Sequence, residues 1–348
     1  MRAKKVLAVL LAGMLSVSLM TGCGQIDQNA TIATVNGTEV SMGLANFYCR
    51  LQQATYEDIY KMYLGTDDVW MADPYNSGTN MQDSVKESAL TELHEMYTLQ
   101  AHMGDYGVEI TEDDKKAISE AAAKFMSDNT GEAADALGAT QEIVEEFLTL
   151  GTIRVRMQDA VKAEADANVS DAEANMRGYT QLLVAGDSQS GEEGADAESL
   201  KATAVQIETE LKAEGATLES VAEAHGLEAS KQTYSTYESA EDTEAEDAEE
   251  DTVMTALKGM KEGETSGLIE KDGAYYFVRV DSETDAEATE SQRQSIITSR
   301  QNDHYSEVLD GWQADDGWEI DMSLFGKIQF DTSLTSTDPN APQTESAQ

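Results

Sequence analysis

Apolar residues recur at helical spacing through most of the first 165 residues. They follow the helical period from Leu44 to Tyr56, directly after Ser41, a residue type that caps helix N-termini. Thr111 and Asp114 have the spacing of a capping box, with Asp in place of the usual Glu. The first half of the chain is therefore predicted to be mainly helical, with helices at about 44–56, 81–105, 112–127, 140–149 and 152–167.

The second half mixes short strands with amphipathic helices. Residues 179–184 and 273–280 are rich in aromatic and β-branched side chains, which favour strands. Asn36-Gly37 is a turn signal between two short strand-like runs near the start of the chain. The pattern predicts an α+β fold. Helices are expected at about 200–213, 218–225, 253–260 and 287–313, then a strand-like tail to residue 334 and disorder over 335–348.

The N-terminus has the pattern of a secretory signal. Three basic residues within the first five precede an apolar run, Val6–Met20, which is too short to span a membrane as a helix of about 20 residues. Small residues stand directly before Cys23, and this ending resembles the lipobox of bacterial lipoproteins. The resemblance implies removal of residues 1–22 and lipidation of the Cys23 thiol. Residues 23–31 are then expected to form a polar tether.

Composition excludes several classes of function. The chain of 348 residues has 67 acidic and 23 basic side chains, a net charge of −44, so it is a poor ligand for nucleic acid. Lipidation of Cys23 would leave Cys49 alone, which excludes an internal disulfide. Residues 238–251 hold nine acidic side chains and no Lys or Arg, which predicts a solvated loop. Neither the four His residues nor the acidic runs have the spacing of a metal site, and no cofactor is expected.

Three stretches together resemble the PrsA/SurA-like extracytoplasmic foldases, which carry a parvulin-type (PpiC-like) peptidyl-prolyl isomerase domain. Residues 33–41, Ala-Thr-Val-Asn-Gly-Thr-Glu-Val-Ser, are similar to the opening hairpin of that family. Residues 212–225 are similar to a parvulin helix. Residues 260–269, Met-Lys-Glu-Gly-Glu-Thr-Ser-Gly-Leu-Ile, are similar to a parvulin turn. Their order and spacing extend the resemblance over nearly the whole chain after Cys23.

The resemblance implies a domain organisation. A helical chaperone lobe, similar to the SurA N-terminal domain, would comprise residues 32–168 and be completed by the helix at 287–313. A parvulin-like domain, 169–282, would be inserted into it. A C-terminal helix and short tail would follow over 283–334.

The resemblance also indicates where an isomerase site would lie. The parvulin family carries a His on its first strand and another on its last, but the matching positions here hold Gln181 and Tyr276. A Gly-rich turn of the family has no counterpart over 226–252. The isomerase chemistry is therefore expected to be weak or absent. Four further residues are expected to bind peptide by the same resemblance: Leu183, Tyr234, Met260 and Phe277.

The sequence thus predicts a foldase or chaperone, lipid-anchored at the outer face of the bacterial cytoplasmic membrane, which binds unfolded, newly secreted polypeptides. Its 15 Met residues suit a surface that accepts many apolar sequences. Two alternatives remain open. One is an active prolyl isomerase with a substituted site. The other is a solute-binding lipoprotein of an importer, which needs two α/β lobes. Clients and oligomeric state are not predicted.

Overall fold

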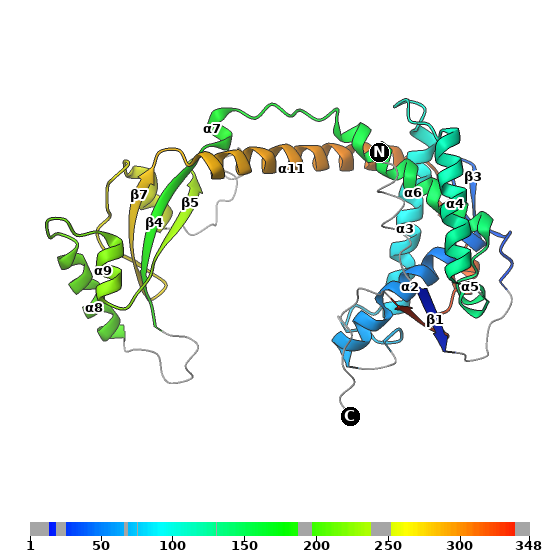
Figure 1. Ribbon diagram of the computed structural model, residues 1–348, viewed down its shortest axis with the longest axis horizontal. Helices are drawn as coiled ribbons and strands as arrows, with labels where there is room; N and C mark the ends of the chain where they lie inside the picture. The colour runs from blue at the N-terminus through cyan, green and yellow to red at the C-terminus, as the bar shows by residue number, and fades with distance from the viewer. Residues whose placement is uncertain are drawn as a thin grey trace. The chain divides into compact units, whose positions relative to one another are not determined.

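The computed structural model describes residues 14–18, 26–65, 69–74, 76–129, 131–186, 197–237 and 252–337. The chain divides into two compact units (Figure 1). One, here called the helical unit, comprises residues 1–165 and 302–348, and the other, the sheet unit, comprises residues 166–301. Helix α11 (Ala286–Gln313) contributes residues to both units. The fold is α+β, as the sequence predicts.

Helix α2 begins and ends where its sequence directs. The Ser41 hydroxyl accepts a hydrogen bond from the Leu44 N–H, and Gly65 ends the helix with a left-handed backbone (φ 66°). The Thr111–Asp114 capping box is confirmed at the start of α4. The helices of the helical unit are α2 (Met42–Leu64), α3 (Met81–His102), α4 (Glu112–Asp128), α5 (Glu132–Leu137), α6 (Gln141–Lys162) and α12 (Met322–Phe325).

Two features of the predicted helices are wrong. The separate helices expected at 140–149 and 152–167 are one helix, α6, which passes through Gly151 and ends at Lys162. Leu150 and Ile153 are buried on either side of that glycine, so tertiary packing outweighs its cost of about 1 kcal/mol in a helix. Helix α5, six residues long, lies in a stretch where no helix was expected.

The core of the helical unit gathers around α2. Phe47 is fully buried and makes edge-to-face contacts with Phe125 of α4 and Phe147 of α6, with ring centroids 5.9 Å and 5.7 Å apart. A second cluster joins α3, α6 and the C-terminal part of α11, where Tyr305 is buried and Trp312 stacks on His102. The C-terminal part of α11 is therefore part of this unit's core.

Strands at both ends of the chain belong to the helical unit. Strands β3 (Thr38–Ser41), β2 (Thr31–Val35) and β8 (Glu319–Ile320) form one antiparallel sheet in that order. Strand β1 (Met14–Ser18), blue in Figure 1, pairs antiparallel with β9 (Ser333–Thr337). Residues 335–337 were expected to be disordered but continue β9, because β1 supplies a pairing partner. Residues 338–348 lie outside the described part of the chain.

The start of the chain also differs from expectation. Residues 26–31, assigned to a polar tether, pack on the helical unit: the Gln28 carbonyl accepts a hydrogen bond from the Gly43 N–H, and its amide donates to the Gly138 carbonyl. Thr31 already belongs to β2. These contacts fix residues 26–31 on the helical unit at the start of β2.

A buried polar row on α2 binds the main chain of the C-terminal segment 329–334. Arg50 donates to the Gln329 carbonyl at 2.6 Å, and Gln53 donates to the Thr332 carbonyl at 2.8 Å. The Glu57 carboxylate accepts from the Leu334 N–H at 2.9 Å and pairs with Lys61. Each polar group is therefore satisfied although all three residues of the row are buried.

The sheet unit contains a four-stranded antiparallel sheet in the order β5-β4-β7-β6. Helices α8 and α9 cover one face of the sheet, and α10 packs against the other. The Ser170–Glu173 capping box opens the short helix α7. The elements are α7 (Asp171–Ala174), β4 (Met176–Val184), α8 (Ala197–Glu210), α9 (Leu218–Ala224), β5 (Ala229–Ser235), α10 (Thr252–Gly259), β6 (Ile269–Lys271) and β7 (Ala274–Ser282).

The Glu57 contact gives a stability prediction with a defined pH dependence. Burial raises the pKa of Glu57, but hydrogen bonds from Leu334 and Lys61 outweigh burial and hold the pKa below its ordinary value of 4.5. The folded state therefore gains stability from this carboxylate above about pH 4.5 and loses it as pH falls through the lowered folded-state pKa.

We expect Glu57→Gln to lower the free energy of unfolding of the helical unit by about 1–3 kcal/mol at pH 7. The loss should shrink at pH 3, which is below the ordinary pKa of 4.5, because the stabilisation by the wild-type carboxylate is lost as pH falls below that value. Tryptophan fluorescence during urea unfolding reports on this unit, because Trp70, Trp312 and Trp318 all belong to it. An equal loss at both pH values would contradict the assigned role of the charge.

Candidate functional site

Gln181 and Tyr276 lie on neighbouring strands of the sheet unit. In the β4–β7 ladder, Gln181 pairs with Val278 and Leu183 pairs with Tyr276. Paired residues of an antiparallel ladder share a face, so Gln181 and Tyr276 are diagonal neighbours on the α10 face, about 7–8 Å apart by strand geometry. Both side chains are partly buried, and no hydrogen bond joins them within the described residues.

The expected peptide-binding residues fall into different environments. Leu183 lies on the same face as Gln181 and is 38% exposed. Met260, after α10, is partly buried against that face. Tyr234 of β5 is buried there too, and its hydroxyl donates to the Leu257 carbonyl at 3.0 Å. Phe277 lies on the opposite face, fully buried beneath α8 and α9, so it does not share a surface with Leu183.

Arg177 holds helix α10 against this face. Its guanidinium donates to the carbonyls of Leu257 (3.4 Å) and Met260 (2.9 Å), at the C-terminal end of α10. It also lies over the Tyr234 ring, 5.5 Å from the centroid, and pairs with Glu283. A cation is favourable at a helix C-terminus because the unpaired carbonyls there carry partial negative charge. No sequence signal predicts this contact, since Arg177 and the two carbonyls that it binds are 80 or more residues apart.

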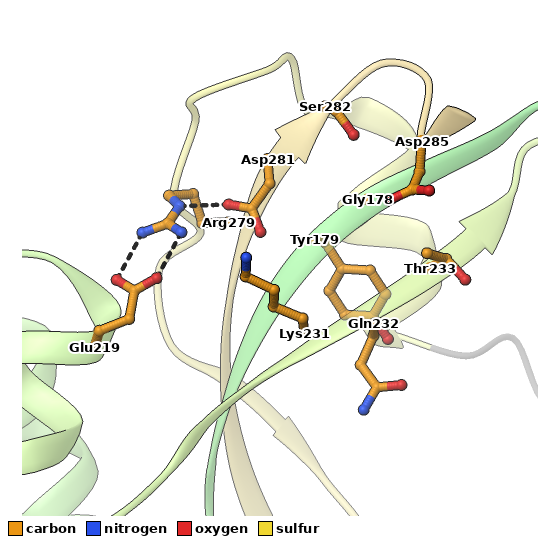
Figure 2. A pocket seen from close by; sticks show the side chains of 10 residues that line it. All are labelled: Gly178, Tyr179, Glu219, Lys231, Gln232, Thr233, Arg279, Asp281, Ser282 and Asp285. Carbon is orange, nitrogen blue, oxygen red and sulfur yellow. Dashed lines mark hydrogen bonds and ion pairs between the residues drawn. The ribbon is translucent and has the colours of Figure 1, made fainter. Parts of the chain in front are cut away.

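A polar cavity of about 550 Å³ lies over the first residues of β4 and the last residues of β7 (Figure 2). Figure 2 shows Arg279 between Glu219 of α9 and Asp281. Two hydrogen bonds at 2.7 and 2.9 Å bind its guanidinium to Glu219, and a third at 2.7 Å binds it to Asp281. The Arg279 contact lowers the pKa of Glu219 to about 2. Arg279 and Glu219 therefore keep fixed charges near neutral pH, which suits fastening α9 to the sheet rather than proton transfer.

An exposed apolar patch lies at the C-terminal end of α2. Met62 and Tyr63 are 76% and 79% exposed, Ile59 is about half exposed, and Met71 in the following loop is exposed as well. Tyr56 stacks on Tyr60 beside them, with ring centroids 5.6 Å apart. We define the α2 patch as Tyr56, Ile59, Met62, Tyr63 and Met71. The Met-rich composition pointed to such a surface, but the apolar positions that predict this helix extend only to Tyr56, before most of the patch.

The described residues offer no metal centre, since no group of three or more His, Cys, Asp or Glu side chains could hold an ion there. His94 contacts Asp316 at 2.7 Å and stacks on Trp318, which are packing roles. Burial raises the pKa of the Cys49 thiol to about 12, so this cysteine is not a nucleophile near neutral pH. Cys23 and the acidic run 238–251 lie outside the described residues.

Neither a family model nor a curated protein matches the sequence. Among solved structures, the chain is similar to a SurA-like chaperone of Campylobacter jejuni, with 11% identity, 84% of this chain and 99% of that chain covered, and a TM-score of 0.29. It is also similar to the foldase protein PrsA of Streptococcus pneumoniae, with 14% identity, 69% of this chain and 87% of that chain covered, and a TM-score of 0.25. The similarity to PrsA of Bacillus subtilis has 16% identity, covers 86% of this chain and 98% of that chain, and has a TM-score of 0.23.

The geometry around Arg177 predicts a local stability effect. Arg177→Met leaves two carbonyls at the end of α10 without their charged donor, and we expect it to destabilise the sheet unit by about 1–3 kcal/mol. Lys231→Met, at an exposed position on β5, is the control and should change stability by less than about 0.5 kcal/mol. Hydrogen exchange of the β4 and β7 amides measures the effect. Wild-type protection in Arg177→Met would contradict it.

Proposed function

We propose that this protein is an extracytoplasmic foldase that binds unfolded, newly exported polypeptides and that its parvulin-like domain contributes binding more than catalysis. The observation that carries the proposal is the α2 patch. Contiguous exposed apolar surface is uncommon on soluble monomers and marks sites of interaction. Two of its five members are Met, whose flexible side chains adapt to many apolar sequences.

The strong negative charge supports the same role. A net charge of −44 keeps the chain soluble despite the exposed patch. It also favours clients that are neutral or basic, since acidic segments are repelled at distances below the screening length of about 8–10 Å. The protein would thus combine a short-range apolar contact with long-range selection by charge.

The sheet unit supports weak or absent isomerase activity. Cis–trans rotation of an X–Pro bond has a barrier of about 20 kcal/mol and takes tens of seconds or more without a catalyst, so an isomerase needs a shaped, polar site. By the resemblance in sequence, Gln181 and Tyr276 stand where the parvulin family carries histidines, so the imidazole groups of that family are missing here. The exposed Leu183 beside Tyr276 offers apolar contact instead. An active isomerase with a substituted site remains the second candidate, on the partial exposure of Tyr276.

We also propose that residues 1–22 are removed on export and that lipid on Cys23 retains the protein at the outer face of the cytoplasmic membrane. The basic start, the short apolar run and the small residues before Cys23 support this. None of the described helices has the length and apolarity to cross a membrane. Two or three acyl chains give stable retention where a single chain does not.

Removing the α2 patch should weaken protection of an aggregating client. We expect the triple variant Ile59→Ser, Met62→Ser and Tyr63→Ser to lose most of the suppression of aggregation of reduced, denatured lysozyme, a basic client, measured by light scattering. The control variant is Val205→Ser with Met322→Ser, which removes exposed apolar side chains outside the patch. Equal suppression of aggregation by both variants would show that the α2 patch does not bind the client. No suppression by the wild type would overturn the proposed function.

The catalytic proposal has a separate test. Isomerisation of a set of X–Pro peptides, followed by exchange NMR, should show no rate above buffer for the wild type. Gln181→Ala and Tyr276→Phe should leave that baseline unchanged, with folding checked by circular dichroism. A clear wild-type rate that falls in either variant would establish the substituted site as catalytic.

A further inference from the structure

The two sides of strand β9 have different partners. On one side, α2 binds its main chain: the Leu334 N–H donates to Glu57, and the neighbouring Thr332 carbonyl accepts from Gln53. On the other side, β1 pairs with β9 over five residues. One side is therefore fixed by buried side chains of the folded unit, while the other is filled by a short strand from the start of the chain.

The register shows which β9 groups serve the second side. Main-chain N–H and C=O groups of successive residues in a strand point to opposite sides. Because the Leu334 N–H points to α2, the N–H groups of Ser333, Thr335 and Thr337 point to β1. These three residues pair with Ser18, Ser16 and Met14. The N–H of Ser336 points, like that of Leu334, to the α2 side.

The occupant of this edge has the character of an exported chain. Strand β1, Met-Leu-Ser-Val-Ser, is uncharged and comes from the apolar run Val6–Met20. That run is part of the segment whose removal on export is proposed above. After removal, β9 keeps its α2 contacts and its other edge becomes unpaired. An unpaired strand edge is a template for an incoming extended chain.

We propose that the β1-facing edge of β9 is a client-binding site, which takes an extended, uncharged apolar segment of an unfolded polypeptide as an added antiparallel strand. This inference rests on the proposed foldase function and names a binding site for it. Main-chain hydrogen bonds supply affinity that does not depend on sequence, as a foldase with many clients requires. Strand β1 is the chain's own example of such an occupant.

Charge favours this occupant over a second copy of the chain. Two copies with a net charge of −44 each repel one another, and a processed copy has no β1 to donate. An uncharged segment meets no such repulsion. Exchange of β1 between two unprocessed copies is a separate outcome, which the molecular mass in solution would reveal.

The test measures binding of a fluorescein-labelled peptide with the sequence of residues 13–19, Gly-Met-Leu-Ser-Val-Ser-Leu, by anisotropy at 0.15 M salt. The full chain should bind weakly, because β1 occupies the edge. Ser16→Pro removes an N–H that points to β9 and should release β1, which raises peptide affinity at least tenfold. Unchanged affinity in Ser16→Pro would overturn the proposal.

A matched pair within β9 then tests main-chain pairing in the Ser16→Pro background. Thr335→Pro deletes an N–H that points to the added strand and should lower affinity tenfold or more. Ser336→Pro deletes one that points to α2 and should change affinity less than threefold. Trp70 contacts Phe330, with ring centroids 4.8 Å apart, so its fluorescence checks that the C-terminal segment stays seated. Equal losses in both variants with unchanged Trp70 fluorescence would overturn the proposal.

The result separates the edge from the proposed function. If the Ser16→Pro, Thr335→Pro chain fails to bind peptide but still suppresses lysozyme aggregation through the α2 patch, the edge is one of two client sites. If none of the three substitutions changes peptide affinity while aggregation is still suppressed, the edge of β9 is not a client-binding site, and the proposed foldase function is unaffected. If the full chain has the mass of a dimer and Ser16→Pro has the mass of a monomer, the edge of β9 binds β1 of a second copy rather than a client.

Discussion

The helical unit depends on the binding of the C-terminal segment by a buried polar row on α2. Arg50, Gln53 and Glu57 are spaced to lie along one stripe of the helix, and each contacts main-chain groups between Gln329 and Leu334. Burying a charge or amide without partners costs several kcal/mol, so this row requires the C-terminal segment to be present. In turn, the segment places Phe330 in the core, next to the buried Ile328 that precedes it. Binding of the C-terminal segment therefore completes the core and provides partners for the buried polar row at the same time.

Binding of the C-terminal segment makes the folding of the helical unit depend on distant parts of the chain. The helical unit uses residues from both the beginning and the end of the chain, and the sheet unit is inserted between them. The C-terminal segment must return after residue 301 before the polar row on α2 is satisfied. A chain still emerging during synthesis or export lacks that segment, so the helical unit completes its core last. The same constraint fixes β9 and leaves its far side for pairing.

Local signals predicted more of the structure than long-range ones. The cap at Ser41 and the box at Thr111 mark helix starts within one residue, because capping is decided by neighbours in sequence. Alternation along each strand indicates which residues of β4 and which of β7 share a face, but the register that makes Gln181 and Tyr276 neighbours comes from the ladder itself. Strand β9 was predicted only as the end of a strand-like tail to residue 334, without its last three residues or its partners. Its residues, Ser-Leu-Thr-Ser-Thr, are mostly polar, and its partners lie more than 270 residues away on α2 and β1.

We propose that β9 has one side bound by α2 and, once β1 is removed, the other side open to an incoming strand. Residue-resolved hydrogen exchange of a chain beginning at residue 23 measures this directly. We predict that the Leu334 amide is protected at all times, whereas the amides of Ser333, Thr335 and Thr337 exchange freely and become protected when the peptide of residues 13–19 is added. Protection of all these amides without peptide, or no change on its addition, would contradict the account.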